Sequence, residues 1–313
     1  MNLSELAKNF SNADEAREFL EKQRWPSGVV CPHCGVVGES YRLVAKAGAK
    51  THVRPGVWKC VCRKQFTVTV GTIFEDSHIP LHKWLMAIHL LCASKKGMSS
   101  HQIHRMLGVT YKTAWFMTHR IREAMAKEPL AKRLSGTVEV DETYVGGKPR
   151  HGAGPRKLVP KAVVVSLVER DGRVKSVHIP SVSSKNLKAV MANYISPNAE
   201  IMTDDFASYG FVKHSYPRHD IIKHKNHNYA RREGSRKINT NTVEGFFSLV
   251  KRGIVGTFHH VSKRHLQRYL NEFDFRYNSR HIDDGSRTLL AIKGATGKRL
   301  TYRTAKQKSV SCN

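Results

Sequence analysis

Acidic residues stand at the ends of two predicted strands in this chain. In VEVDETYVGG the apolar residues alternate along a strand that finishes beside Asp141 and Glu142. In AEIMTDDFASYG a short apolar strand runs directly into Asp204 and Asp205. If Val140 faces the core, strand alternation favours Asp141 over Glu142 as the residue that points into a site. Asp204 is favoured over Asp205 because it lies closest to its strand, so Glu142 and Asp205 are the second choices.

A third carboxylate, Glu244, lies near the start of a predicted helix in NTNTVEGFFSLVKRG. Lys251 follows seven residues later, about two helical turns, and therefore shares its face. Carboxylate oxygens on rigid elements are ligands for Mg²⁺ or Mn²⁺, and two such ions about 3.5–4 Å apart suit phosphodiester chemistry. One such acid alone is more often a solvated residue or an ion-pair partner. Together they favour a site for two ions formed by Asp141, Asp204 and Glu244.

Four cysteines in two tight pairs predict a structural zinc site. A C-x-x-C pair and a C-x-C pair are formed by Cys31, Cys34, Cys60 and Cys62. Thiolates in two such knuckles supply the ligands of one tetrahedral Zn²⁺. Disulfides are not expected, because nothing in the sequence indicates secretion. The second pair is one residue shorter than usual, so His33 and His52 are alternative ligands.

Helical periodicity begins near Pro80 and continues to Met125. A short predicted helix ends at Leu107-Gly108, and Thr110 can cap a longer helix after it. Helix, tight glycine turn and helix form a helix-turn-helix, whose second helix can enter the major groove of DNA. An ordinary three-helix packing unit has the same pattern. The polar residues of the second helix that mostly point away from its apolar face are the candidate DNA contacts: Tyr111, Lys112, Thr113, Arg120 and Arg122.

The composition favours a polyanionic partner. The 313 residues include 53 Lys plus Arg and 25 Asp plus Glu, a formal net charge of +28. Self-repulsion on this scale is a cost to a compact protein, and nucleic acid is the usual polyanion that offsets it. No run of about 18 apolar residues predicts a membrane span, and the first residues lack the layout of a signal peptide. We therefore expect a cytoplasmic protein.

Changes in pattern divide the chain into several α+β parts. These are a helical lead-in at 1–28, a small β zinc ribbon at 29–76, a helix-turn-helix region at 77–128, an α/β domain at 136–285 and a basic tail at 286–313. Within the α/β domain, strands are predicted at 138–144, 161–168, 174–178, 200–203 and 219–224, and helices at 184–194, 241–251 and 262–277.

Taken in order, these motifs resemble those of the ISXO-type bacterial insertion-sequence transposases. The strings that carry the resemblance are CPHCG, CRKQFTVTVGTIFE, VEVDETYVGG, IMTDDFASYG, NTNTVEGFFSLVKRG and HHVSKRHLQRYLNEFDFRYNSR, and they cover about residues 15–285. The resemblance implies an N-terminal zinc ribbon and a DDE catalytic domain of ribonuclease H-like fold. Asp141, Asp204 and Glu244 match the catalytic triad, and Lys251 matches the basic residue after the glutamate.

The predicted function is that of a DNA transposase. It would cut element ends and join the released 3′-hydroxyl to target DNA with two Mg²⁺ or Mn²⁺ ions. By analogy, the synapsis of two double-stranded ends implies a homodimer or a larger assembly. The alternatives are a ribonuclease H-like nuclease without strand transfer and a non-catalytic DNA-binding regulator derived from a transposase. The intact acids argue against the regulator, and the zinc ribbon with the helix-turn-helix favours recognition of DNA ends over the nuclease.

Overall fold

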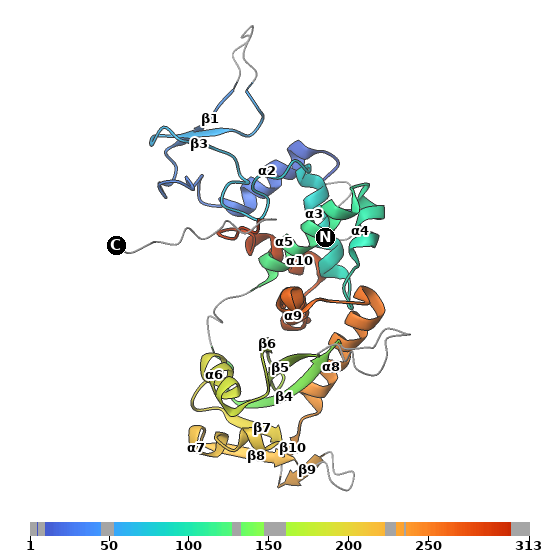
Figure 1. The fold of residues 1–313 in the computed structure, drawn as a ribbon. Coiled ribbons are helices and arrows are strands. Elements are labelled where there is room, and N and C mark those ends of the chain that lie inside the picture. The colour runs from blue at the N-terminus through green and yellow to red at the C-terminus, as the bar shows by residue number, and fades with distance from the viewer. Residues whose placement is uncertain are drawn as a thin grey trace, which may run out of the picture. The chain divides into compact units, whose positions relative to one another are not determined.

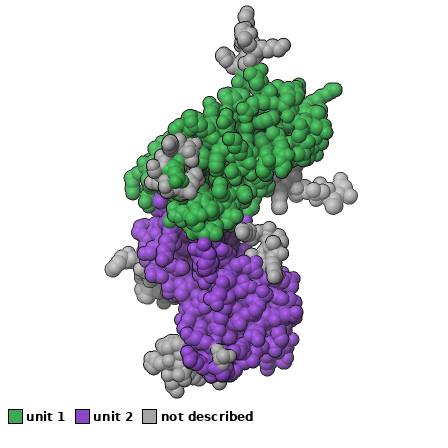
Figure 2. All heavy atoms as spheres, turned by 180° about the vertical axis from the view of Figure 1, so that it is seen from behind, with its two compact units in different colours: residues 1–93, 100–125, 282–313 green, residues 94–99, 126–281 purple. Residues whose placement is uncertain are grey.

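The computed structural model describes residue 5 and residues 10–44, 53–126, 133–146, 161–222, 230–234 and 236–301. The chain forms two compact units, shown in two colours in Figure 2. Unit 1 contains residues 1–93, 100–125 and 282–313, and unit 2 contains residues 94–99 and 126–281. Within the described part of the chain, no helix is both long and apolar enough to cross a membrane.

Unit 1 begins with helix α2 (Ala13–Arg24). Asn12 caps this helix, because its Oδ1 accepts two backbone N–H groups of the first helical turn at 2.9 and 3.0 Å. At the other end of the helix, Arg24 donates to the backbone carbonyls of Val68 and Val70 at 2.6 and 2.7 Å. The helix is therefore hydrogen-bonded to residues 68 and 70, within the range predicted for the zinc ribbon.

The ribbon is a three-stranded antiparallel sheet of β1 (Ser40–Arg42), β2 (Trp58–Cys60) and β3 (Gln65–Phe66). Such short strands bury little surface by themselves. Trp25 adds to the packing, with its ring edge-on to Trp58 and Phe66 at centroid distances of 6.1 and 5.9 Å.

The helical part of unit 1 contains α3 (Leu81–Ala93), α4 (Ser100–Leu107), α5 (Tyr111–Met125) and α10 (Asp284–Lys293) (Figure 1). As predicted, α4 ends at Leu107 and Thr110 caps α5, whose Thr113 amide donates to the Thr110 hydroxyl at 3.2 Å. Helix α10 corrects the expectation of a basic tail from residue 286. It packs on α3 and α5, and Thr288, which is fully buried, bonds His89 of α3 at 3.1 Å.

Unit 2 is built on a five-stranded mixed sheet of order β6-β5-β4-β7-β8. Its strands are β4 (Thr137–Val145), β5 (Ala162–Glu169), β6 (Val174–Ile179), β7 (Glu200–Asp204) and β8 (Arg218–Ile222). Strands β4, β5 and β6 are antiparallel neighbours, whereas β7 runs parallel to both β4 and β8. The predicted strands are present, and the arrangement is consistent with the expected ribonuclease H-like fold.

Helices cover the two faces of this sheet. One core contains apolar residues of β4, β5 and α6 (Ser184–Tyr194), and the other contains residues of β5, α8 (Asn241–Gly253) and α9 (Lys263–Asn278). Between the strands and helices lie η1 (Ala207–Tyr209), α7 (Val212–Ser215) and η3 (Ile254–Phe258).

Directly before α8, the chain forms a hairpin of β9 (Ala230–Glu233) and β10 (Arg236–Asn239) that the sequence analysis did not predict. Every residue of β9 is exposed, so the strand lacks the alternating apolar pattern that predicts one. The hairpin is attached through Ile238, which packs on Met202 and Ile222.

Candidate catalytic and metal sites

Strand β4 points its side chains alternately to the two faces of the sheet. Val138 and Val140 are fully buried in the core that includes Leu187 of α6. Asp141 has the opposite parity, which it shares with Val145, and Val145 lies in the core with Phe246 of α8. Val140 therefore faces a core, as the choice of Asp141 over Glu142 required. Asp141 faces the side of the sheet that α8 covers.

Asp204, at the end of β7, lies on the same face. Parallel pairing sets Val138 beside Ile201 and Glu139 beside Met202. Two residues further along this register, Asp141 is level with Asp204, and level residues of neighbouring strands point to the same side. The two carboxylates that end the predicted strands are thus brought together.

Glu244 belongs to the first turn of α8, the helix that covers this face. The Thr240 hydroxyl donates to its carboxylate at 3.0 Å, which orients the side chain. Lys251 is exposed on the same helix, two turns further on. Glu244 acts on Asp141 electrostatically, so all three predicted acids share one neighbourhood.

Burial raises the pKa of Asp141 to about 7, and the negative charges of Glu142, Asp204 and Glu244 raise it as well. A hydrogen bond from the backbone amide of Glu142, at 2.7 Å, acts in the opposite direction. Carboxylates that repel one another in this way favour a proton or a bound cation between them.

The acids fit a hard divalent cation by the chemistry of their oxygens, although they do not converge on one point. Over the described ranges, the four cysteines are the single group of His, Cys, Asp or Glu side chains placed closely enough to hold one ion. Mutual repulsion keeps uncompensated carboxylates apart, and cations remove it. Oxygen ligands from the ends of two strands and from one helix suit Mg²⁺ or Mn²⁺.

Glu142 lies on the other face of β4, with a different partner. The hydroxyl of Tyr209, which is 1% exposed, donates to its carboxylate at 2.7 Å. Burial raises the pKa of Glu142, and this hydrogen bond partly offsets the effect. Asp205 follows the end of β7 and is exposed. Glu142 therefore lies on the sheet face opposite Asp141, and Asp205 lies beyond the strand that ends at Asp204.

Glu139 is not among the predicted site residues, yet its carboxylate is completely buried beside them. It accepts the backbone amides of Thr242 and Val243 in the first turn of α8, at 2.8 and 3.1 Å. Arg170 donates to it at 2.9 Å. The available signal was its position two residues before Asp141, which places both acids on one face of the strand.

The predicted cysteine cluster is assembled. All four Sγ atoms lie within 4.8 Å of one another, with Cys31 and Cys62 separated by 3.8 Å and Cys34 and Cys60 by 3.5 Å. Thiolates about 2.3 Å from a tetrahedral Zn²⁺ lie about 3.8 Å apart, so the cluster fits this ion. The C-x-C pair supplies both of its cysteines. His33 instead packs its ring against Phe66, and His52 lies outside the described residues.

The helix-turn-helix candidates divide into two groups. Tyr111 and Lys112 are exposed and Thr113 is half-buried at the start of α5. Arg120 and Arg122 are 5% and 0% exposed, which contradicts their predicted role as DNA contacts. A helical pattern shows which residues share a face, but it does not show which faces other segments cover.

The buried position of Arg120 has a clear physical basis. Its guanidinium donates to the backbone carbonyls of Ile73, Glu75 and Leu300 at 2.7, 2.8 and 3.0 Å. It also stacks over the ring of Phe116 at 4.6 Å. These contacts satisfy a charged group inside the fold, so Arg120 joins three segments of unit 1.

The comparisons with known proteins agree with this architecture. The family model of the ISXO2-like transposase domain matches residues 133–278, which contain all three acids, and that of the transposase zinc-ribbon domain matches residues 11–65. Over these two ranges the chain is similar to the ISXO2-like transposases.

Two curated proteins also match the chain. An uncharacterized protein in transposable element ISH50 of Halobacterium salinarum is 26% identical over 291 residues, which are 86% of this chain and 92% of that protein. An uncharacterized transposase-like protein of Haemophilus influenzae is 29% identical over 115 residues, covering 35% of this chain and 85% of that protein.

Proposed function

We propose that the chain is a DNA transposase that cuts the ends of its insertion sequence and joins the 3′-hydroxyl to target DNA. The observation that supports the proposal is that three acids lie on one side of the sheet, in a domain that matches a transposase family model. Asp141 and Asp204 come from adjacent parallel strands, and Glu244 comes from the helix that covers them. Acids supplied in this way can serve as ligands for two metal ions in phosphodiester chemistry.

In this proposal Asp141, Asp204 and Glu244 hold two Mg²⁺ or Mn²⁺ ions. When bound, the ions supply Lewis-acid activation of the attacking and leaving oxygens. Asp141 would act as a ligand in its carboxylate form, with its proton released to solvent, and Thr240 orients Glu244 through its hydroxyl. Lys251, exposed on the same helix, supplies a positive charge for a DNA phosphate.

Recognition of double-stranded ends is assigned to unit 1. Tyr111, Lys112 and Thr113 begin the second helix of the helix-turn-helix, the part of such a helix that reads base edges. The zinc ribbon keeps its short strands folded through one structural Zn²⁺. Two ends must be handled together, so the active form is a homodimer or a larger assembly.

The test uses purified protein, labelled DNA in which the element end is joined to flanking sequence, the same ends with a free 3′-hydroxyl, and a target plasmid in Mg²⁺. Joined products support the transposase, whereas cutting without joining indicates a nuclease and binding alone indicates a regulator. Asp204→Asn should abolish cutting and joining while DNA binding survives. Asp205→Asn is the matched control, because it removes an equal charge one residue beyond the strand. Equal effects of the two substitutions would contradict the assignment of Asp204.

A further inference from the structure

We propose that Glu139 is a positioning residue that fixes the first turn of α8, and with it Glu244, relative to Asp141. This role rests on the function proposed above. It explains how Asp141 of β4 and Glu244 of α8 are kept at a constant distance from each other. Glu139 is assigned no contact with a reacting group. It acts through the backbone of α8.

The carboxylate of Glu139 takes the place of a helix cap. The residue at the N-cap position of α8, Thr240, makes no side-chain capping bond. One oxygen of Glu139 accepts the amides of Thr242 and Val243, at 2.8 and 3.1 Å. The other accepts the hydroxyl of Thr242 at 2.9 Å. The unpaired N–H groups and the positive end of the helix dipole thus meet a negative charge supplied by β4.

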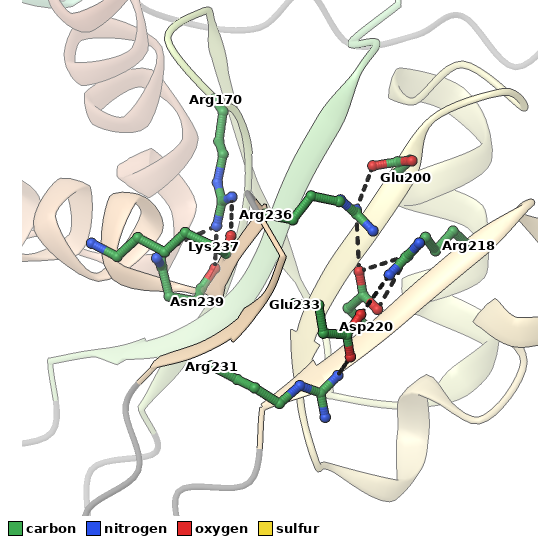
Figure 3. A network of polar contacts seen from close by, with 9 residues as sticks. All are labelled: Arg170, Glu200, Arg218, Asp220, Arg231, Glu233, Arg236, Lys237 and Asn239. Carbon is green, nitrogen blue, oxygen red and sulfur yellow. Dashed lines mark hydrogen bonds and ion pairs between the residues drawn. The ribbon is translucent and has the colours of Figure 1, made fainter.

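Arg170 extends the same contact to the segment before α8. The Nε of Arg170 donates to Glu139 at 2.9 Å. Its two other guanidinium nitrogens donate to the backbone carbonyls of Lys237 and Asn239 on β10 (Figure 3). The side chain of Asn239 then accepts the amide of Asn241, the first residue of α8, at 3.2 Å. The entry into the helix and its first turn are therefore both bound to one arginine–glutamate pair.

These contacts form a short path between proposed metal ligands. Glu139 precedes Asp141 by two residues on one strand face, and Val243 directly precedes Glu244. Ligands for metal ions must be held to within about 0.5 Å of their working geometry. A fully buried carboxylate is costly unless charge and hydrogen bonds compensate it. Glu139 has both, so it can hold the helix at a fixed height above β4.

The experiment compares Glu139→Gln with Glu169→Gln in the full-length protein. Glu169 is a close match, since it accepts the backbone amides of Ser135 and Arg173 and pairs with Arg173, but it does not touch α8. Hydrogen exchange over residues 240–247 reports on the helix turn without DNA or metal. Cleavage of labelled ends across a Mg²⁺ titration reports on the ligands.

We expect Glu139→Gln to speed exchange at Thr242 and Val243 by about tenfold or more and to raise the Mg²⁺ concentration for half-maximal cleavage by a similar factor. Glu169→Gln should do neither. Unchanged exchange, or equal shifts in both variants, would overturn the proposal. If Glu139→Gln does not fold, Thr242→Val replaces it, because it removes the hydroxyl that donates to Glu139. Thr242→Val should give a smaller increase in exchange rate and in the required Mg²⁺ concentration. Thr242→Ser keeps the hydroxyl and should give neither increase. Equal behaviour of these two would also overturn it.

The two proposals fail in different ways. If the wild-type protein shows no metal-dependent cleavage, the proposed function is wrong, and the exchange measurement still decides whether Glu139 holds α8. If the wild-type protein cleaves DNA and Glu139→Gln needs no more Mg²⁺ than the wild type, the function stands and the positioning role is wrong.

Discussion

Adjacent acids on β4 occupy different chemical environments because strand side chains alternate. Glu139 and Asp141 point to the α8 side, whereas Glu142 points to the α6 side and binds Tyr209. A buried tyrosine hydroxyl satisfies Glu142, and a helix terminus satisfies Glu139. Asp141 is surrounded by the negative charges of other acids. Of the three acids on β4, it is therefore the one that a bound cation would stabilise most.

Asp141→Asn and Glu142→Gln separate these roles. The first keeps the size of the side chain and removes the charge that would hold an ion, so cleavage and joining should both fall by about 100-fold or more. Binding to element ends should persist or tighten slightly, because a negative charge near DNA is lost. Glu142→Gln keeps an acceptor for Tyr209 and should change the rates by less than about tenfold. Gel assays of labelled ends measure both, and the reverse ranking would show that the ligand is Glu142.

Cys60→Ser and Cys92→Ser form a second pair at this scale. Both thiols are buried, but only Cys60 belongs to the four-cysteine cluster. Elemental analysis should find about one Zn²⁺ per chain in the wild type and in Cys92→Ser. Cys60→Ser should contain much less Zn²⁺ per chain. Hydrogen exchange should then speed up over residues 29–70 in Cys60→Ser. A metal-free protein with a protected ribbon would contradict the zinc site.

At the scale of elements, one face of α9 covers the edge of the sheet formed by β6. Gln267, Asp274 and Asn278 are spaced by seven and four residues, so they share a helix face. They accept the backbone amides of His178, Ser176 and Val174 on β6, at 2.9, 2.8 and 2.7 Å. Edge amides that would otherwise be open to another strand are thus occupied.

This edge contact predicts a pH dependence of stability. Burial raises the pKa of Asp274 to about 7, although the Ser176 hydrogen bonds lower it. In the unfolded chain the pKa is about 3.9. Between these values the folded state keeps a proton that the unfolded state loses, so the contribution of Asp274 to stability falls as pH rises from about 4 to 7.

Asp274→Asn should remove this titration. The unfolding free energy of the variant, relative to wild type, should rise across that window, by at most about 1.4 kcal/mol per pH unit. Urea denaturation of both proteins at several pH values measures the difference, and other titrating groups cancel between them. A difference that does not vary with pH would show that Asp274 is not protonated in the folded protein.

Lys112, at the start of α5, and the buried Arg120 should respond differently to substitution. Lys112→Ala should weaken binding to element ends and reduce the log–log salt slope by about 0.9 if Lys112 contacts one phosphate. Arg120→Met should lower the free energy of unfolding by about 3 kcal/mol, because three backbone carbonyls lose a charged donor. Salt-dependent binding and urea denaturation measure the two effects. A salt slope that changed with Arg120→Met alone would reverse the assignment.

Local signals predicted much of this structure. Asn12 and Thr110 have the side chains that caps require, the strands of unit 2 have apolar patterns, and the cysteine pairs have metal-ligand spacing. What the sequence did not predict depends on contacts distant in the chain. Burial of Arg120 needs carbonyls from two remote segments, and the role of Glu139 needs a helix about 100 residues away.

At the scale of the whole molecule, each unit is assembled from separated stretches of chain. Unit 1 combines the zinc ribbon and the helix-turn-helix with residues that follow the complete α/β domain. Helix α10 buries Thr288, Ala291 and Ile292, and Arg287 donates to the carbonyl of Cys92 at 3.1 Å. Helix α10 is therefore part of the core of the proposed DNA-recognition unit.

A stop codon after His281 tests this dependence, with a stop codon after Thr301 as the control. The first removes α10 and the Leu300 carbonyl that binds Arg120, whereas the second leaves both in place. Loss of α10 uncovers apolar surface of α3 and α5, so hydrogen exchange should speed up over residues 81–125 and binding to element ends should fall. The amides of β4 to β7 should remain protected, since no part of unit 2 is deleted. If the two truncated proteins exchanged alike over residues 81–125, α10 would be dispensable for unit 1, and recognition would depend on the N-terminal segments alone.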